Sequence, residues 1–265
     1  MENEEIIGLI ITIIMGFGWG SFATMATYRI PLGMPWIGDK PRCFKCKHEL
    51  FLIDYLSIIS YFLWKGRCRY CGDEYECSFS YFFTEAAITA FFVMCYLKYG
   101  FGDLFVLMTL MIVGGVILTV VDAENKKIPS KILISLLLIG AVYRVFVDGT
   151  FYGGLYGGIT GLVLGLFIRH IYYLVKGEAK KGFDYTVWQH EDRFIGPAFD
   201  YVKLLGVVGV FLPLVHLVSY IAIVGAVTLL WRLVNKTSLR IGSIMAMALI
   251  VSVIYPETLN YVTGY

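Results

Sequence analysis

Long apolar stretches recur along the whole chain, and the short segments between them carry most of the charged residues. A helix of about 20 apolar residues crosses the hydrocarbon core of a bilayer, and in lipid the backbone must satisfy its own hydrogen bonds. With 58% hydrophobic and 16% charged residues among 265, the pattern excludes an ordinary soluble domain. It predicts an all-α membrane protein, a polytopic helical bundle of about eight transmembrane helices. The predicted spans are residues 6–28, 79–97, 103–121, 131–148, 154–174, 201–214, 216–234 and 240–256.

The distribution of charge predicts how the chain is inserted. The first residues, MENEE, are acidic, whereas a signal peptide has a basic start, so the first apolar segment should persist as a transmembrane helix. If the N-terminus is outside, only Lys98 and Arg144 of the 22 Lys and Arg residues fall clearly at outside ends. This agrees with the positive-inside rule and predicts that both termini are extracytoplasmic. The net charge of +2 gives no indication of a nucleic-acid partner. The apolar spans predict the lipid bilayer as a partner.

Two CxxC motifs lie in the one sizeable polar segment, residues 32–78. Their cysteines are Cys43 and Cys46, then Cys68 and Cys71, with 21 residues between the two pairs. Each pair can chelate from a tight turn, and four thiolates complete a tetrahedral zinc site. Because sulfur fills all four positions, the zinc is expected to be structural and to supply folding energy that so small a loop lacks. Two disulfides are the alternative interpretation, which a reducing cytoplasm disfavours.

Glycines at helical spacing predict close contacts between helices. Gly16 and Gly20 lie four residues apart in the first span, and the fifth span contains the run GGLYGGITGLVLG. Small residues at every third or fourth position let two helix backbones approach closely. We therefore interpret both patterns as packing faces.

Acidic residues in or beside the predicted spans are the candidates for chemistry. Asp122 directly follows the third span and Asp200 directly precedes the sixth, so both are expected at the cytoplasmic boundary of the membrane. Two carboxyl groups a few ångströms apart share a proton, so that one can activate water while the other polarises a carbonyl. Spacing alone leaves two alternatives open, solvated loop charges and a proton or ion pathway. Glu85, inside the second span, is either a functional carboxyl or one that reaches the interface.

Several short motifs are shared with a known family. They are Gly20-Ser21-Phe22, Tyr28-Arg29-Ile30-Pro31, Asp54-Tyr55-Leu56, Gly66-Arg67-Cys68-Arg69-Tyr70-Cys71-Gly72, Glu85, and Asp122 followed by Ile128-Pro129. With these motifs the chain resembles the bacterial prepilin peptidases, or type IV leader peptidases, which are GxGD membrane aspartic proteases. The resemblance covers most of the chain and implies that Asp122 is the first catalytic aspartate.

The resemblance also implies a function. Members are polytopic proteins of the bacterial cytoplasmic (inner) membrane that cleave the short basic leader from type IV prepilins and related pseudopilins at the cytoplasmic face. Many also N-methylate the new terminus with S-adenosylmethionine, and their cysteine loop is associated with that activity. The chain has no nucleotide-binding glycine fingerprint, so methylation is implied by the resemblance alone. The expected domains are a first transmembrane helix at 1–31, the cysteine loop at 32–78 and a transmembrane peptidase domain at 79–265.

The second catalytic motif departs from the family pattern, which is Gly-x-Gly-Asp followed closely by Lys-Leu. When the chain is aligned with the family pattern on Lys203, Tyr201 falls at the aspartate position and Asp200 stands one residue before it. Aligned on the upstream Gly177, the position falls at Asp184, as though a segment had been inserted. We expect Asp200 to be the second catalytic aspartate. It begins a span, where a one-residue bulge could turn its side chain to the direction that the family's aspartate has. Asp184 is the alternative.

A later Pro-Phe-Gly-Pro element of the family is also changed, to Arg240-Ile241-Gly242-Ser243. These departures favour, as a first rival interpretation, a relative that binds prepilins without cutting them. The second rival is an unrelated transporter or channel with a zinc-bound loop. A transporter should carry polar groups deep in several spans, and the spans here are nearly free of them.

Overall fold

The structure is a computed structural model, and it describes most of the chain. The described residues are 2–35, 42–43, 45–51, 54, 57–73, 78–125, 128–149, 151–175, 199–212, 214–235 and 241–254. They divide into two compact units, Met1–Ile117 and Leu118–Tyr265, and the boundary falls inside one helix.

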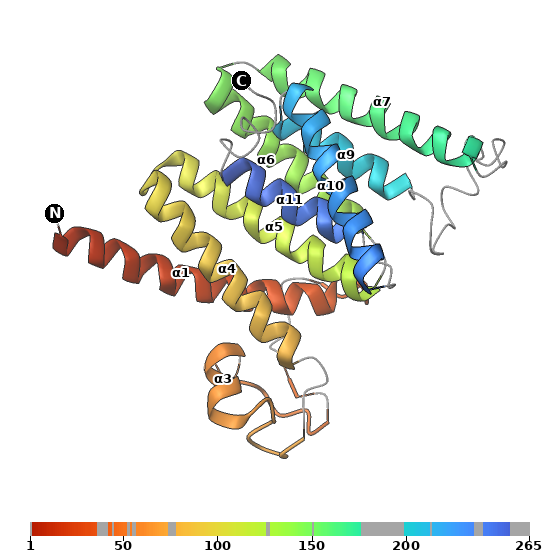
Figure 1. Cartoon of the computed structure of the whole chain (residues 1–265). Coiled ribbons are helices and arrows are strands. Elements are labelled where there is room, and N and C mark those ends of the chain that lie inside the picture. The colour runs from red at the N-terminus through yellow and green to blue at the C-terminus, as the bar shows by residue number, and fades with distance from the viewer. Residues whose placement is uncertain are drawn as a thin grey trace. The chain divides into compact units, whose positions relative to one another are not determined.

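Helices make up nearly all of the described chain. They are α1 (Glu2–Arg29), α3 (Ser57–Trp64), α4 (Ser78–Tyr99), α5 (Asp103–Asn125), α6 (Ser130–Asp148), α7 (Phe151–Val175), α9 (Phe199–Phe211), α10 (Leu214–Asn235) and α11 (Ile241–Ile254) (Figure 1). Each of the eight predicted spans overlaps one of these helices, and the short α3 lies in the cysteine loop. The predicted all-α fold is confirmed for the described residues.

Four helices are long and apolar enough to cross a membrane. They are Asn3–Arg29, Tyr81–Tyr99, Asp103–Asn125 and Tyr152–Val175. The apolar helices His216–Leu230 and Ile241–Ile254 are shorter. α9 has 13 residues and rises about 20 Å, less than the roughly 30 Å of a hydrocarbon core. Length and composition therefore support four of the eight predicted spans among the described residues.

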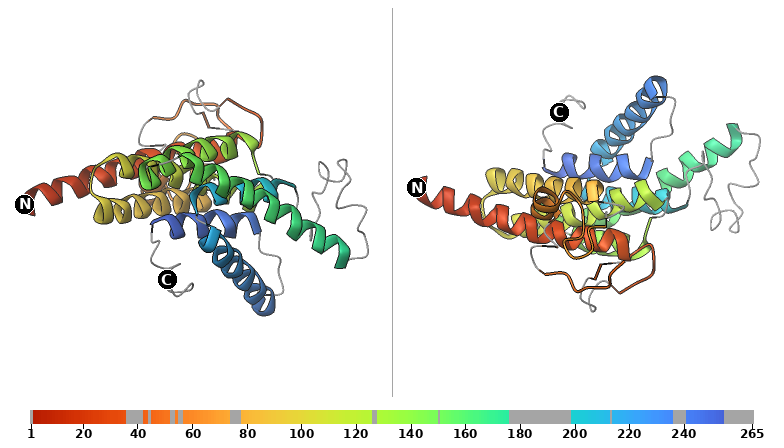
Figure 2. Two further views of the ribbon diagram at one scale, coloured as in Figure 1. Left: turned by 90° about the horizontal axis from the view of Figure 1, so that it is seen from above. Right: turned by 90° about the horizontal axis from the view of Figure 1, so that it is seen from below.

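The first unit is organised around the contact of α1 with α4, which run side by side (Figures 1 and 2). A Cβ at Gly16 would lie 2.7 Å from the Thr89 Cα atom, and one at Gly20 would lie 2.9 Å from the Glu85 Cα atom. Any larger residue would force the two backbones apart, which confirms the packing role predicted for this pair of glycines.

The second unit has its closest helix contact between α7 and α9 (Figures 1 and 2). A Cβ at Gly157 would collide with the backbone carbonyl of Gly209, and one at Gly161 would collide with the carbonyl of Leu205. The glycine face predicted for the fifth span therefore packs directly on the α9 backbone. Through this contact and a further one with α6, α9 is held with a fixed face toward the interior of the unit.

Candidate active site and metal site

Asp122 lies in the last turn of α5, within the second unit, and is completely buried. A carboxylate is costly to bury unless hydrogen bonds compensate for its lost hydration. The burial excludes the simple interpretation of Asp122 as a helix-ending residue whose charge is solvated by water.

Two hydrogen bonds to Asp122 come from the first turn of α11. The backbone N–H of Ser243 donates to Oδ2 of Asp122 at 2.8 Å, and the Ser243 hydroxyl lies 3.0 Å from the same oxygen. The hydroxyl is also 3.0 Å from the backbone carbonyl of Thr119. The N–H groups of a first helical turn have no intrahelical acceptor, and the positive end of the helix dipole favours a negative charge there.

α9 presents Tyr201 to the other carboxylate oxygen. The phenol oxygen of Tyr201 is 3.5 Å from Oδ1 of Asp122, at the outer limit of a hydrogen bond. Gly242 packs against the same two side chains, because a Cβ at this position would lie 2.7 Å from Oδ2 of Asp122 and 2.8 Å from Cε1 of Tyr201. Glycine at 242 therefore lets α11 approach closely enough for the Ser243 contacts to form.

Asp200 occupies the first turn of α9 but has a different partner. Its Oδ1 accepts a hydrogen bond from Nζ of Lys203 at 2.9 Å, and its side chain is 38% exposed. Successive helical residues point about 100° apart, and α9 is helical from Phe199 onward. The helix thus turns Tyr201, not Asp200, toward Asp122, as the alignment on Lys203 had indicated. The alternative, Asp184, lies outside the described residues.

Sequence reasoning did not single out Ser243 as a contact of the catalytic candidate. The signal was present, because Arg240-Ile241-Gly242-Ser243 retains the glycine of the family element and replaces its last proline by a residue with two donors. The alignment on Lys203 put Tyr201 at the aspartate position, although Asp200 was the residue expected to be catalytic, and the contact of Tyr201 with Asp122 depends on how α5 and α9 meet.

Glu85 is completely buried in α4 of the first unit. Its Cα, Cβ and Cγ atoms lie against Gly20 of α1. The side chain of Glu85 is therefore enclosed by protein within the first unit.

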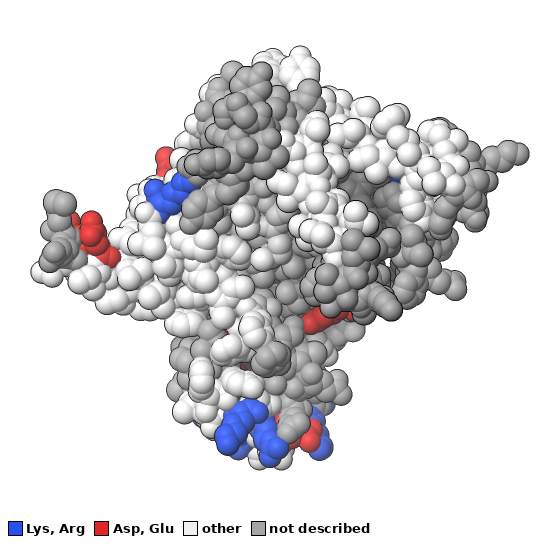
Figure 3. All heavy atoms as spheres, viewed as in Figure 1, with Lys and Arg blue, Asp and Glu red and all other residues white. Residues whose placement is uncertain are grey.

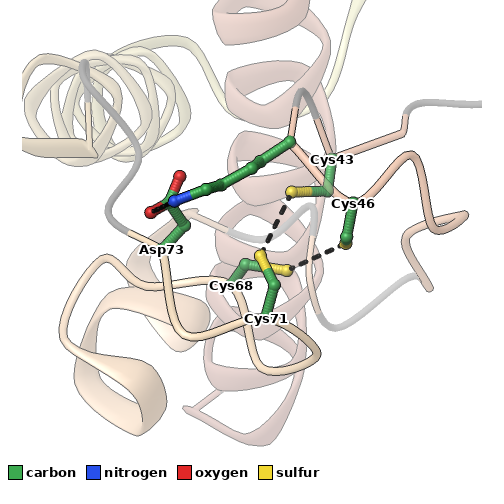
Figure 4. Close-up of polar contacts among 6 residues, drawn as sticks. Cys43, Cys46, Cys68, Cys71 and Asp73 are labelled. Atoms are coloured by element: carbon green, nitrogen blue, oxygen red, sulfur yellow. Dashed lines mark hydrogen bonds and ion pairs between the residues drawn. The ribbon is translucent and has the colours of Figure 1, made fainter.

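The four cysteines of the loop come together in the first unit (Figure 4). The Sγ atoms of Cys43, Cys46, Cys68 and Cys71 all lie within 4.8 Å of one another, and none of these residues is in a disulfide. The Cys43–Cys71 and Cys46–Cys68 sulfur distances are 3.8 and 3.9 Å. Tetrahedral zinc with Zn–S bonds of about 2.3 Å requires sulfurs about 3.8 Å apart. The cluster could therefore bind a metal such as zinc, and the disulfide interpretation is wrong for these cysteines.

The two CxxC turns are built in the same way. The carbonyl of Cys43 accepts the N–H of Lys47 at 2.9 Å, and the carbonyl of Cys68 accepts the N–H of Gly72 at 2.7 Å. Lys47 and Gly72 both have positive φ angles, 57° and 73°. Lys47 and Gly72 each stand four residues after the first cysteine of a pair. Their left-handed backbone closes the turn, so that both thiols of the pair point to one side.

Charged groups tie the two turns together. Lys45, from the first turn, forms a hydrogen-bonded ion pair with Asp73, from the second, and this partner raises the pKa of Lys45 (Figure 4). The backbone N–H of Asp73 lowers the pKa of Cys71. Desolvation and the neighbouring thiols have the opposite and larger effect, so the pKa is raised to about 11 overall. Without metal this thiol is protonated at neutral pH, so metal binding must displace its proton.

The second half of the loop is held by an arginine among aromatic rings. The guanidinium of Arg69 lies 5.6 Å from the ring centre of Trp64 and 4.8 Å from that of Tyr70. Its Nε is 3.8 Å from the carboxylate of Asp54, which accepts the N–H of Phe51. Lys and Arg side chains gather on the outer surface of this loop (Figure 3). They are Arg42, Lys45, Lys47, Lys65 and Arg67, all exposed.

Comparison with known proteins finds similarity over part of the chain. Residues 14–99 match the family described as Bacterial Peptidase A24 N-terminal domain. A prepilin leader peptidase/N-methyltransferase of Bacillus subtilis is 32% identical over 152 residues, which is 56% of this chain and 59% of the relative. A protein of the same name from Vibrio cholerae is 27% identical over 151 residues, 52% of this chain and 57% of the relative.

These matches leave part of each relative uncovered, since the aligned region spans somewhat under three-fifths of their length. No solved structure matches the chain. The matched domain contains the cysteine cluster and the α1–α4 contact. The resemblance inferred from the motifs is confirmed, since part of the chain is similar to bacterial prepilin leader peptidases, and four of its helices are long and apolar enough to cross a membrane.

Proposed function

We propose that this protein is a membrane endopeptidase that removes the leader from type IV prepilins or pseudopilins. The observation that carries the proposal is Asp122, a completely buried carboxylate that accepts hydrogen bonds from Ser243, at the position that the resemblance gives to the first catalytic aspartate. The names of the two relatives support the substrate class.

In the proposed reaction Asp122 is the general base. Its carboxylate takes a proton from water, the water oxygen attacks the scissile carbonyl, and a second acid donates a proton to the carbonyl oxygen. When the C–N bond breaks, the amine leaves with the proton held by Asp122, and the second acid takes back a proton from one hydroxyl of the gem-diol, which leaves the carboxylic acid product. Asp200 is proposed as the second acid, which requires the first turn of α9 to rotate so that Asp200 takes the place of Tyr201 beside Asp122, and Asp184 is its alternative. The Asp200–Lys203 pair is partly exposed, and such pairs are worth only about 0–1 kcal/mol, so substrate binding can displace Lys203.

The proposed setting is the bacterial inner membrane, crossed eight times with both termini extracytoplasmic. The aspartates and the cysteine loop then lie at the cytoplasmic side. The first proposed span is α1, and the polar loop follows its basic end at Arg29. Basic leaders are attracted to anionic lipid at that face. The proposed partners are therefore the prepilin or pseudopilin substrates and the bilayer.

The cysteine loop is proposed to hold one structural zinc ion through Cys43, Cys46, Cys68 and Cys71. The ion stabilises the loop, and with four sulfur ligands it has no position for a reacting water. N-methylation of the new terminus by S-adenosylmethionine is proposed from the names of the relatives. No residue is assigned to that reaction.

Cleavage of a prepilin in membranes tests the peptidase and identifies the second acid. The wild type is expected to cut the leader, and Asp200→Asn is expected to abolish the cut while Asp184→Asn stays active. If Asp184→Asn is the inactive variant, the second acid has been assigned wrongly. Retained cutting by both variants would contradict a dyad built from either residue.

A second candidate function is prepilin binding without cleavage. Tyr201 favours it, because a phenol stands beside Asp122 where the family carries its second aspartate. On this candidate the wild type binds a prepilin and leaves it intact, and Tyr201→Asp gains cleavage because two carboxyl groups then face each other. Prepilin capture and leader cleavage, measured together, separate the two functions. Cleavage by the wild type excludes the second candidate.

A further inference from the structure

We propose that Ser243 is a positioning residue for Asp122, and that it holds the carboxylate ready to act as the base. This inference rests on the proposed peptidase function. Ser243 offers two hydrogen-bond donors to the same oxygen of Asp122. Its backbone nitrogen lies 2.8 Å from Oδ2, and its hydroxyl oxygen lies 3.0 Å from Oδ2. Both residues belong to the second unit and both are buried.

The backbone N–H fixes which way the carboxylate faces. Ser243 is the third residue of α11, where an N–H has no acceptor within the helix. With both donors on Oδ2, rotation of the carboxylate about its Cβ–Cγ bond is restrained. Oδ1, directed toward Tyr201, is the oxygen that takes the proton from water in the proposed reaction. Restraint of this kind helps the chemical step more than it helps substrate binding.

The hydroxyl can follow the charge of Asp122. It has one proton and two acceptors at the same distance, Oδ2 of Asp122 and the carbonyl of Thr119, both 3.0 Å away. When Asp122 is charged, the stronger acceptor is the carboxylate, and the hydroxyl donates to it. After Asp122 has taken a proton, the hydroxyl can turn to the Thr119 carbonyl. The contact therefore strengthens in the state in which the base is ready.

Three substitutions at one position separate the two donors. Ser243→Ala removes the hydroxyl and keeps the N–H. Ser243→Pro removes both, and proline is tolerated in the first turn of a helix, where the missing N–H breaks no helical bond. Ser243→Thr keeps both donors. Ser252→Ala is the matched control, because Ser252 is also a buried serine of α11, about 14 Å further along the helix.

The measurement is kcat and KM for prepilin cleavage in detergent or vesicles, with Tm for each variant. We expect kcat to fall about tenfold in Ser243→Ala and further in Ser243→Pro, with KM nearly unchanged. Ser243→Thr should restore most of the rate, and Ser252→Ala should match the wild type. The inference is overturned if Ser243→Ala and Ser243→Pro keep the wild-type kcat, or if KM rises while kcat is unchanged.

A Tm cycle tests the contact without relying on activity. The variants are Asp122→Ala, Ser243→Ala and the double variant. Because each single substitution already breaks the same hydrogen bond, the double variant should lose less Tm than the two losses added together. Losses that add would overturn the inference. If the wild type does not cleave, the proposed function has failed, and this cycle still decides whether Ser243 holds Asp122.

Discussion

Asp122→Asn is expected to abolish leader cleavage, lowering the rate by at least about 10³-fold. The asparagine amide has nearly the shape of the carboxylate, and its oxygen can still accept the Ser243 N–H, so the packing of the second unit should persist. The proton acceptor is lost, and water at the scissile carbonyl is no longer activated. The measurement is the amount of mature pilin formed with time in membranes containing equal amounts of each protein.

Asp103→Asn is the matched control for this substitution. Asp103 lies on the same helix, at its exposed first turn, so its loss changes the charge of α5 without touching the buried site. It should cut at the wild-type rate. An Asp122→Asn variant that still matured the prepilin would show that Asp122 is a structural carboxylate, and the proposed mechanism would be wrong.

A double substitution of Cys43 and Cys46 by serine is expected to remove zinc from the protein and to unfold the cysteine loop. Structural zinc contributes about 10–16 kcal/mol to the folding of small zinc-binding peptides at neutral pH, and among the described residues of this loop few apolar side chains besides the cysteines are buried. We expect zinc per purified chain to fall from about one to near zero. Trypsin should then cut rapidly at the exposed Lys65 and Arg67 in vesicles whose loop faces the protease.

Cys95→Ser is the control for this prediction. Cys95 is a buried cysteine of α4 that is not part of the cluster, so zinc content and resistance to trypsin should stay at wild-type values. Exhaustive chelation of the wild type should reproduce the behaviour of the double variant. Unchanged zinc content after loss of Cys43 and Cys46 would contradict a four-cysteine site.

Several features could be inferred from the order of residues because their causes are local. Apolar runs form helices in lipid or in a protein interior, so each of the eight predicted windows overlaps a helix of the described residues. The glycines of the fifth span were interpreted correctly as a packing face, since a Cβ at Gly157 or Gly161 would meet the α9 backbone. The two CxxC spacings predicted the cysteine cluster, because each pair closes its own turn.

The arrangement around Asp122 had to come from the folded chain. Whether Asp200 or Tyr201 faces α5 depends on the rotation of α9 about its axis, where one residue changes the direction by about 100°. That rotation is set by glycine contacts with α7, which lie far from the aspartate in sequence. Ser243 reaches Asp122 across 121 residues, and no local pattern encodes that approach. Local sequence thus specifies helices and turns, whereas the partner of a buried charge is chosen by the packing of helices against one another.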